Sequence, residues 1–219
     1  MCPVRTKDSI TQALIAQGAV AVVRLDDTDR LAWLADTLRD AGLDALEITM
    51  TVPGAIDQIR RLVDRIGPDH LVGVGSVRTP RDAEHAIDAG AAYVVSPVFE
   101  PEVLRVAADR GVPAMPGCFT PTEVHRAHEA GADIIKVFPA DVLGRAFFRA
   151  VLAPMPHLRL MPTGGVTPEN AGEWIRAGAV AVGIGSALLN KKAIADRDGA
   201  VITELVSSLR SSIERARNA

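Results

Sequence analysis

The feature that most constrains the fold is a repeated alternation of short apolar segments with longer amphipathic segments. The apolar segments are rich in β-branched residues, and most of the amphipathic segments end in Gly or Ala-Gly. This alternation is typical of βα units, in which parallel strands are connected by helices. It predicts eight strands, at 19–25, 45–51, 70–77, 92–97, 112–117, 133–139, 158–165 and 180–186.

Start and stop signals indicate the helices between these strands. Three expected helix starts read "TPRDAE", "TPTEVH" and "TPEN". Each supplies an N-cap hydroxyl, a proline for the first turn and an acidic side chain that suits the helix dipole. Glycine follows many of the expected helix ends. Helices are predicted at 29–41, 54–66, 80–89, 101–110, 121–130, 144–153 and 168–177, with a leading helix at 6–17 and a final one at 198–216.

Eight strands, each followed by a helix, predict a (β/α)8 TIM barrel with an extra N-terminal helix. The alternative is an open doubly wound sheet. No G-x-G-x-x-G follows the first strand, and the glycine-rich turns come late, after the seventh and eighth strands, which favours the barrel. With 219 residues, 48% of them hydrophobic, and no linker or low-complexity tract, residues 1–219 are expected to form one domain.

Composition argues against several classes of protein. A net charge of −3 without a basic cluster makes nucleic acid and anionic membranes poor partners. No apolar stretch approaches the roughly 18 residues that span a bilayer, and no signal peptide is evident, so we expect a cytoplasmic protein. Cys2 and Cys118 have no metal-type spacing, which suggests a reducing compartment. His125 and His128 share a helix face but lack a third ligand, so no metal or other cofactor is expected.

Lys136 stands out because it interrupts the apolar run "DIIKVFP" in a chain that has only four lysines. An ammonium group that leaves water must find a partner or lose its proton. One interpretation is structural, with the amine reaching solvent or forming an ion pair. The other is chemical, with a neutral amine kept in the barrel as a nucleophile. Lys136 alone does not decide between them.

The alternation of side chains along the strands brings other polar residues to the same place. If Ile135 and Val137 face the helices, Lys136 faces the barrel interior. The same alternation turns Glu47, Thr49 and Thr51 inward, and Arg24 and Ser76 lie near the ends of the first and third strands. Barrel enzymes place their chemistry at the carboxyl ends of the strands. A structural ion pair between Lys136 and Glu47 is the alternative, but such pairs seldom outperform apolar packing, so a catalytic site is favoured.

Two glycine-rich turns follow the seventh and eighth strands. They read "MPTGGVTPEN" and "AVGIGSALL", and each alone is most often a simple turn. Together they occupy the position where barrels bind phosphate through exposed backbone N–H groups. The predicted donors are Gly164, Gly165, Gly185 and Ser186.

Seven segments in the same order carry a resemblance that spans almost the whole chain: "LEITMTVPGA", "VGVGSV", "VVSPVFE", "MPGCFTPTE", "IKVFPADVLG", "MPTGGVTPEN" and "VGIGSALL". They resemble the Schiff-base aldolases that cleave 2-keto-3-deoxy-6-phosphogluconate (KDPG). Relatives in that family act on the galactonate epimer and on 4-hydroxy-2-oxoglutarate (KHG). The resemblance implies a (β/α)8 barrel, a metal-free reaction and a homotrimer.

The resemblance also implies roles for individual residues. Lys136 corresponds to the Schiff-base lysine, Glu47 to the acid/base residue, and Ser76 to a position near the keto-acid end that is usually threonine. The four residues of the glycine turns correspond to the phosphate site. Some members bind the carboxylate with an arginine at the position of Thr51. Others lack that arginine and have one at the end of the first strand, which makes Arg24 the candidate ligand here.

Three functional alternatives remain at this point. The first is an aldolase that prefers the galactonate epimer. The two epimers differ by one inverted hydroxyl group, which only a few contacts with the protein would recognise. The second is a non-catalytic phosphate-binding barrel, against which the presence of both Lys136 and Glu47 argues. The third is a barrel isomerase with Glu47 as its base and Lys136 as an electrostatic helper. Formation of a covalent pyruvate adduct on Lys136 distinguishes the aldolases from the other two.

Overall fold

The computed structural model describes residues 6–67 and 70–219, so Cys2 lies outside the described residues. All strand pairs in this part of the chain are parallel. Each of the eight predicted strand segments contains a strand, usually shorter than expected. The strands are β1 (Ala19–Val23), β2 (Ala45–Thr49), β3 (Leu71–Gly75), β4 (Val94–Val95), β5 (Ala114–Met115), β6 (Gly117–Cys118), β7 (Ile135–Val137), β8 (Leu160–Pro162) and β9 (Val182–Ile184).

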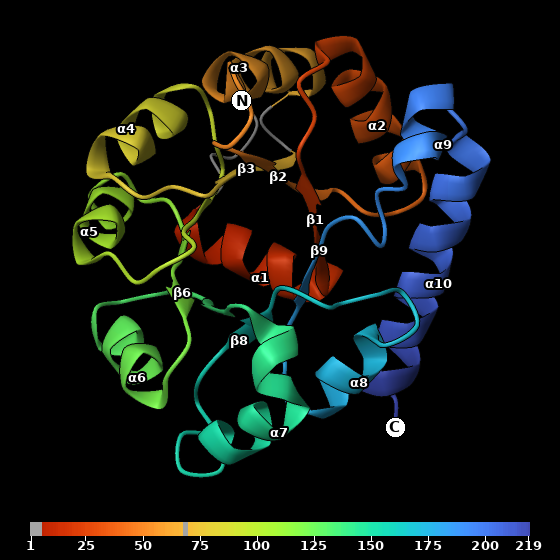
Figure 1. The fold of residues 1–219 in the computed structure, drawn as a ribbon. Helices are drawn as coiled ribbons and strands as arrows, with labels where there is room; N and C mark the ends of the chain where they lie inside the picture. The colour runs from red at the N-terminus through yellow and green to blue at the C-terminus, as the bar shows by residue number, and fades with distance from the viewer. Residues whose placement is uncertain (1–5, 68–69) are drawn as a thin grey trace.

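The strands form two arcs that together make the predicted barrel. One arc has the order β5-β4-β3-β2-β1-β9 and the other has the order β6-β7-β8. Isolated parallel bridges from Leu160 to Ala179 and from Thr163 to Gly183 join β8 to the β9 segment. On the opposite side, Pro116 separates β5 from β6, because proline has no N–H to donate to a neighbouring strand. Figure 1 shows the resulting ring of strands inside a ring of helices.

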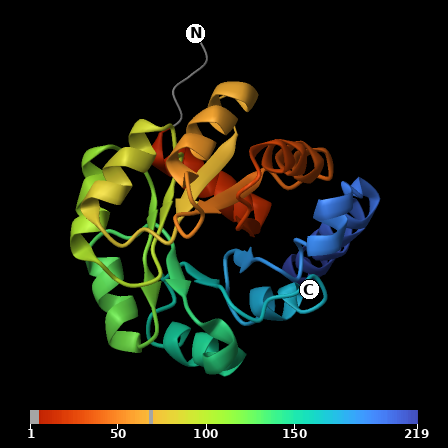
Figure 2. The same cartoon turned by 45° about the horizontal axis from the view of Figure 1, so that its top comes forward.

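The helices also follow the predicted order. They are α1 (Lys7–Gln17), α2 (Thr28–Asp40), α3 (Ala55–Ile66), α4 (Pro80–Asp88), α5 (Pro101–Asp109), α6 (Pro121–Glu129), α7 (Ala140–Leu152), α8 (Ala171–Arg176), α9 (Lys191–Asp196) and α10 (Gly199–Arg217). Helices α3 to α6 follow one another around one side of the barrel, and α10 lies against α8 and α2 on the other side (Figure 2).

Three differences from the predicted helices need correction. The helix expected at 168–177 begins at Ala171, after a turn in which Asn170 N donates to Thr167 Oγ1 at 3.3 Å, so the start predicted at "TPEN" is three residues too early. The helix expected at 144–153 begins at Ala140 and continues through a kink at Gly144, whose φ of 71° is not helical. The short helix α9 was not predicted, although the Asn190 side chain caps it by accepting a hydrogen bond from Ala193 N at 3.0 Å. The predicted cap at Thr120 is confirmed, because Thr120 and Glu123 form a reciprocal capping box.

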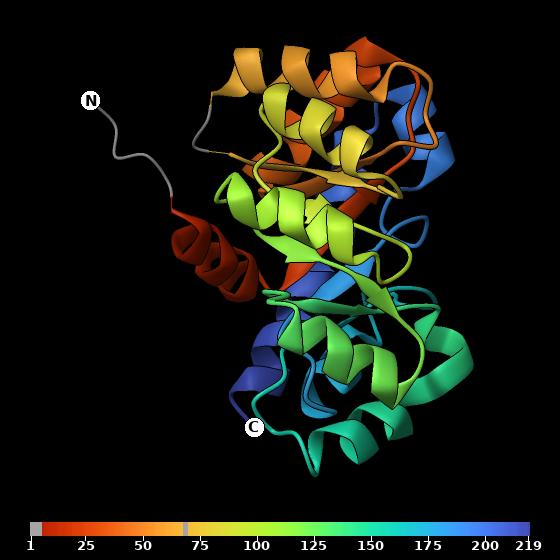
Figure 3. The same ribbon diagram turned by 90° about the vertical axis from the view of Figure 1, so that its left-hand side faces the viewer.

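The apolar core has an outer and an inner part. The outer part lies between strands and helices and includes Leu46, Ile48, Ile135 and Val137, as the strand alternation predicts. The inner part fills the barrel and contacts α1, which covers the amino ends of the strands (Figure 3). Its buried members are Ile10, Leu14, Val20, Ala45, Leu71, Tyr93, Val95, Met115, Ile134, Met161 and Ala181. The opposite, carboxyl end of the barrel is therefore the end that is open to a ligand.

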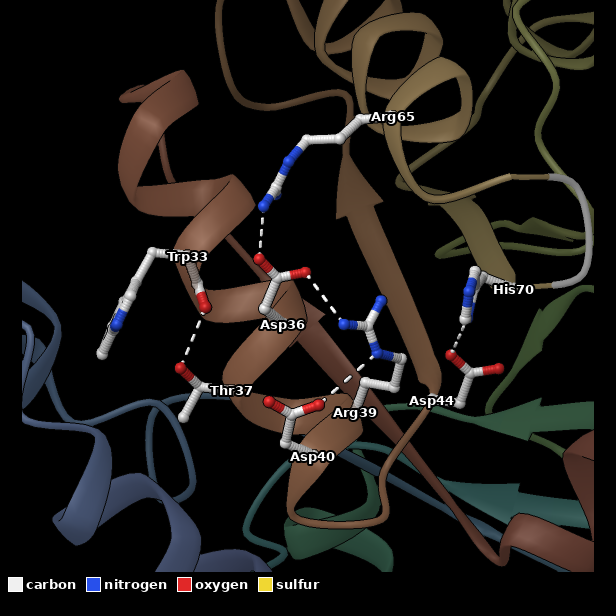
Figure 4. A network of polar contacts seen from close by, with 8 residues as sticks. All are labelled: Trp33, Asp36, Thr37, Arg39, Asp40, Asp44, Arg65 and His70. Atoms are coloured by element: carbon white, nitrogen blue, oxygen red, sulfur yellow. Dashed lines mark hydrogen bonds and ion pairs between the residues drawn. The ribbon is translucent and has the colours of Figure 1, made fainter.

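Polar contacts hold the closed end together. Lys7 of α1 pairs with Asp133 at 3.2 Å, and Arg217 of α10 donates to the carbonyls of Ala16 and Ile15 at the end of α1. Figure 4 shows two further links. Asp36 of α2 pairs with Arg65 of α3, and Asp44 lies 2.6 Å from His70 just before β2 and β3 begin. None of the helices in residues 6–67 and 70–219 combines the length and the apolar composition that a bilayer span requires.

Candidate active site

Lys136 lies in the middle of β7 and faces the barrel interior. Its neighbours in sequence, Ile135 and Val137, belong to the outer core, and only 6% of Lys136 is exposed. Its backbone is in register with Gly117 on β6 and Met161 on β8. The Lys136 amine lies 5.1 Å from the centroid of the Phe138 ring, which is the next inward residue along the chain. The face of the Phe138 ring therefore forms one wall of the pocket that holds the buried amine.

Glu47 lies in β2, and its side chain is also buried, with 1% exposed. Its carboxyl group extends over Gly75 of β3, where any Cβ atom would overlap Glu47 Oε1. Burial raises the pKa of Glu47, while the charges of Lys136 and Arg24 oppose that rise. Among the described residues, Lys136 forms no ion pair within 4.0 Å. The acid and the amine thus share the interior without the structural salt bridge that was the alternative interpretation.

The predicted hydroxyl groups lie at the ends of β2 and β3. Thr49 and Thr51 are hydrogen-bonded to each other, with 2.7 Å between their Oγ1 atoms, and Thr51 is the exposed member of the pair. Ser76 follows β3 directly and has a φ of 61°. Positive φ is uncommon for residues other than glycine, and such residues cluster at functional sites.

Arg24 follows β1, and its side chain is exposed rather than enclosed in the barrel. Its Nη1 atom lies 3.8 Å from the position that a Cβ atom of Gly185 would occupy. Arg24 and Ser186 line the same cleft of about 470 Å³, together with the basic residues Arg30 and Lys191. Arg24 is therefore close to the second glycine turn, and its charge also acts to lower the pKa of Glu47 against the effect of burial. Sequence reasoning missed Arg30 and Lys191, which are basic residues on surface helices with no distinguishing motif.

The two glycine turns lie side by side, because the β8 and β9 segments are bridged between Thr163 and Gly183. Gly164 and Gly165 have φ values of 104° and 67°, which other residues rarely adopt. The Asn170 side chain fixes this turn by donating to the Gly165 carbonyl at 2.9 Å. Gly185 and Ser186 follow β9 directly. The structure thus brings together the four predicted phosphate donors.

One neighbour of the glycine turns was not anticipated. The carboxylate of Asp141, in the first turn of α7, lies 3.0 Å from the position of a Cβ atom on Gly164. No signal in the sequence marks Asp141, since acidic residues are common in the first turn of any helix.

The histidines and Cys118 do not assemble a metal site. No group of three or more His, Cys, Asp or Glu side chains in residues 6–67 and 70–219 could hold a metal ion. His128 packs against His157, with 4.7 Å between the ring centroids, rather than forming a pair with His125. Cys118 is buried in the core, and burial raises the pKa of its thiol to about 12.

Comparison with known proteins identifies the family of the chain. The family model of KDPG and KHG aldolase matches residues 10–205. The 2-dehydro-3-deoxy-6-phosphogalactonate aldolase of Escherichia coli (strain K12) is 33% identical, over 89% of this chain and 96% of the relative. The 2-dehydro-3-deoxy-phosphogluconate aldolase of Haemophilus influenzae is 32% identical, over 94% of this chain and 99% of the relative.

A solved structure extends the similarity to the fold. KDPG aldolase from Legionella pneumophila, with pyruvate captured as a covalent carbinolamine intermediate, has a TM-score of 0.85 and 27% identity. The alignment covers 94% of this chain and 98% of that one. The barrel and these similarities define an aldolase, which is a lyase of carbon–carbon bonds. The chain belongs to the KDPG and KHG aldolase family.

Proposed function

We propose that this aldolase cleaves KDPG to pyruvate and glyceraldehyde 3-phosphate through a Schiff base on Lys136. The observation that carries the proposal is a buried amine and a buried carboxyl group that share the barrel interior, close enough for the charge of the amine to act on the carboxyl group. The neutral amine attacks the C2 ketone of the substrate, and loss of water gives a protonated imine. The imine accepts the electron pair of the C3–C4 bond as that bond breaks.

Glu47 moves the protons in this reaction. Its carboxylate accepts the proton of the C4 hydroxyl, directly or through one water molecule, as the C3–C4 bond breaks. It later returns a proton to C3 of the enamine, and hydrolysis of the resulting imine releases pyruvate and restores the Lys136 amine. Proton transfer by a positioned side chain typically contributes about 10²–10⁴ in rate. Because burial raises the pKa of Glu47, its protonated form is accessible closer to neutral pH than that of an exposed carboxyl group.

The two charged ends of the substrate bind at different places. Arg24, with the hydroxyls of Thr51 and Ser76, binds the keto-acid carboxylate, because an anion that leaves water needs a charge-assisted partner. The backbone N–H groups of the two glycine turns bind the phosphate. These turns contain Gly164, Gly165, Gly185 and Ser186.

A second candidate is cleavage of the galactonate epimer, which is favoured by the similarity to the E. coli phosphogalactonate aldolase. The two substrates differ only in the configuration of one hydroxyl group. Measuring kcat/KM for both epimers, and for KHG, decides the substrate. We expect cleavage of KDPG to be the fastest, and faster cleavage of the galactonate compound would reverse the assignment.

Catalysis itself is tested by the products. Pyruvate and glyceraldehyde 3-phosphate should form in equal amounts from KDPG. Lys136→Arg and Lys136→Ala should both abolish turnover while the protein stays folded, because arginine keeps the charge but cannot form an imine. Turnover above a trace in either variant would exclude the Schiff-base role and leave the isomerase or binding-protein alternatives.

We further propose that residues 1–219 act as one barrel domain in a cytoplasmic homotrimer, as the family resemblance implies. Light scattering on the purified protein tests the assembly. A mass near 70 kDa, about three times the 23.2 kDa chain, is expected, and a mass of one or two chains would contradict it.

A further inference from the structure

The single tyrosine of the chain, Tyr93, is fully buried inside the barrel, with 0% of its surface exposed. Among the described residues, its hydroxyl oxygen has no hydrogen-bond partner. Leaving a buried donor unsatisfied costs about 1–3 kcal/mol, and buried tyrosine hydroxyls usually have a partner. Phenylalanine would fill the same space without that cost. Packing alone therefore does not account for the hydroxyl group.

Tyr93 lies at the same level of the sheet as Glu47. Glu47 on β2 is in register with Gly73 on β3, and the pairing of Val74 with Val94 places Tyr93 on the other side of Gly73. The backbones of Tyr93 and Glu47 are thus two strand spacings apart, or about 10 Å. That distance is within the combined reach of a tyrosine and a glutamate side chain.

Two glycines of β3 give these side chains room to approach each other. A Cβ atom on Gly73 would overlap the Cε2 and Cζ atoms of Tyr93, so the hydroxyl end of the ring lies across β3 toward β2. A Cβ atom on Gly75 would overlap the Glu47 carboxyl group in the same way. The Tyr93 ring therefore lies over Gly73, and the Glu47 carboxyl group lies over Gly75, the next inward position of β3.

The ionisation of the two groups suits a hydrogen bond in which the Tyr93 hydroxyl is the donor and the Glu47 carboxylate is the acceptor. Burial raises the pKa of Tyr93 well above its ordinary value, with further contributions from Glu47 and then Asp44. The hydroxyl therefore remains a donor throughout the working pH range. The charged groups that act on Glu47 are Lys136 on β7, in the other arc of the barrel, and Arg24, which follows the adjacent strand β1.

We propose that Tyr93 is a positioning residue, whose hydroxyl donates a hydrogen bond through one water molecule to the Glu47 carboxylate. This bond holds the carboxyl group over Gly75, and it stabilises the ionised form that the buried site otherwise disfavours. The inference rests on the proposed proton-transfer role of Glu47 for its effect on catalysis. The contact itself can be tested without substrate.

Tyr93→Phe removes only the hydroxyl oxygen. Carbon-13 NMR titration of labelled glutamate side chains, assigned with Glu47→Gln, reports the pKa of Glu47 directly. We expect Tyr93→Phe to raise that pKa by about one unit, the size of one hydrogen bond to a charged group. The acidic limb of the kcat/KM profile should move upward with it, and kcat should fall about tenfold. Borohydride trapping of pyruvate should remain at the parent level.

Because the chain has one tyrosine, 3-fluorotyrosine labels this site alone. The fluorinated phenol is a stronger donor, so it should lower the pKa of Glu47, and its fluorine signal should follow the Glu47 titration. The fluorotyrosine-labelled protein keeps both the ring and the hydroxyl group. It therefore supplies the test if Tyr93→Phe fails to fold. Met115→Leu is the matched control, because it repacks the same inner core without changing a polar atom. It should leave the Glu47 titration unchanged.

If the pKa of Glu47 is the same in Tyr93→Phe as in the parent, there is no contact and Tyr93 only fills space. The same holds if the fluorine chemical shift does not change as Glu47 titrates. An equal shift in Met115→Leu would also overturn the contact, because the effect would then come from packing. Failure of the proposed function looks different. In that case the parent protein would show the NMR shifts but would neither trap pyruvate nor cleave KDPG.

Discussion

Burial and the neighbouring positive charges shift the pKa of Glu47 in opposite directions. Burial is the larger effect, so the pKa of Glu47 lies above its ordinary value of 4.5 despite the nearby charges of Lys136 and Arg24. The folded protein then binds a proton more tightly than the unfolded chain does, and its stability declines as pH rises through this range. The ionised carboxylate is therefore a cost to the fold, which a catalytic role explains.

The first prediction follows from this balance. A base must be ionised, so kcat/KM should fall as pH drops through a pKa above 4.5. Glu47→Gln should remove this fall of kcat/KM at low pH and lower kcat by about 10²–10⁴. The variant should still trap pyruvate. It should also unfold at no lower temperature than the parent at pH 8, because it removes a buried charge. Turnover at the parental rate would mean that another group or water alone is the base.

The second prediction concerns the keto-acid carboxylate. Arg24→Met should weaken apparent pyruvate affinity in the trapping assay by about 1.5–3 kcal/mol, the range for hydrogen bonds to charged groups. Thr51→Val should cost less, about 1 kcal/mol. The position of Arg24 beside Gly185 adds a control, which is the inhibition constant for glyceraldehyde 3-phosphate. Weaker binding of that compound with unchanged pyruvate affinity would assign Arg24 to the phosphate end instead.

The alternation of side chains explains which site residues could be predicted from the sequence. Lys136 and Glu47 lie within strands, where each side chain must face either the helices or the interior. Arg24 lies one residue beyond the end of β1, where that constraint stops, and its side chain lies closer to the β9 turn than expected. Tyr93 was not predicted, because a tyrosine in "AYVVSP" is indistinguishable from an ordinary core residue until its unpaired hydroxyl is seen.

Among the secondary-structure elements, α1 has the clearest separate role, because it closes the amino end of the barrel. Leu14 is its fully buried contact with the inner core, whereas Gln12 on the same helix is exposed. Leu14→Ala should lower the free energy of unfolding in urea by about 2–5 kcal/mol. Gln12→Ala should change it by less than about 0.5 kcal/mol. Equal losses in the two variants would show that α1 does not support the barrel.

The boundaries that the sequence missed have local physical causes. The helix predicted at 144–153 starts four residues too late, because the chain is already helical from Ala140 and only kinks at Gly144. The six-residue helix α9 is too short to show an amphipathic period, although Asn190 marks its start. Pro116 divides one predicted strand into β5 and β6, because the missing N–H interrupts the ladder at one residue only.

For the whole molecule, the proposed mechanism needs no metal, because the imine supplies the electron sink. Prolonged treatment with a chelator should therefore leave kcat/KM unchanged, and added Zn²⁺ or Mg²⁺ should not raise it. The absence of a metal-binding cluster from residues 6–67 and 70–219 motivates this prediction. Loss of activity in chelator, with recovery on adding one divalent ion, would contradict it.

The most direct test of the whole account is covalent trapping of pyruvate. The protein is incubated with pyruvate and borohydride, digested and examined by mass spectrometry, with Lys136→Arg as the matched control. We predict one reduced pyruvate adduct on the peptide that contains Lys136, and none on this peptide in the control. No adduct on the parent protein, or an adduct on Lys7, Lys191 or Lys192 instead, would show that Lys136 does not form the Schiff base.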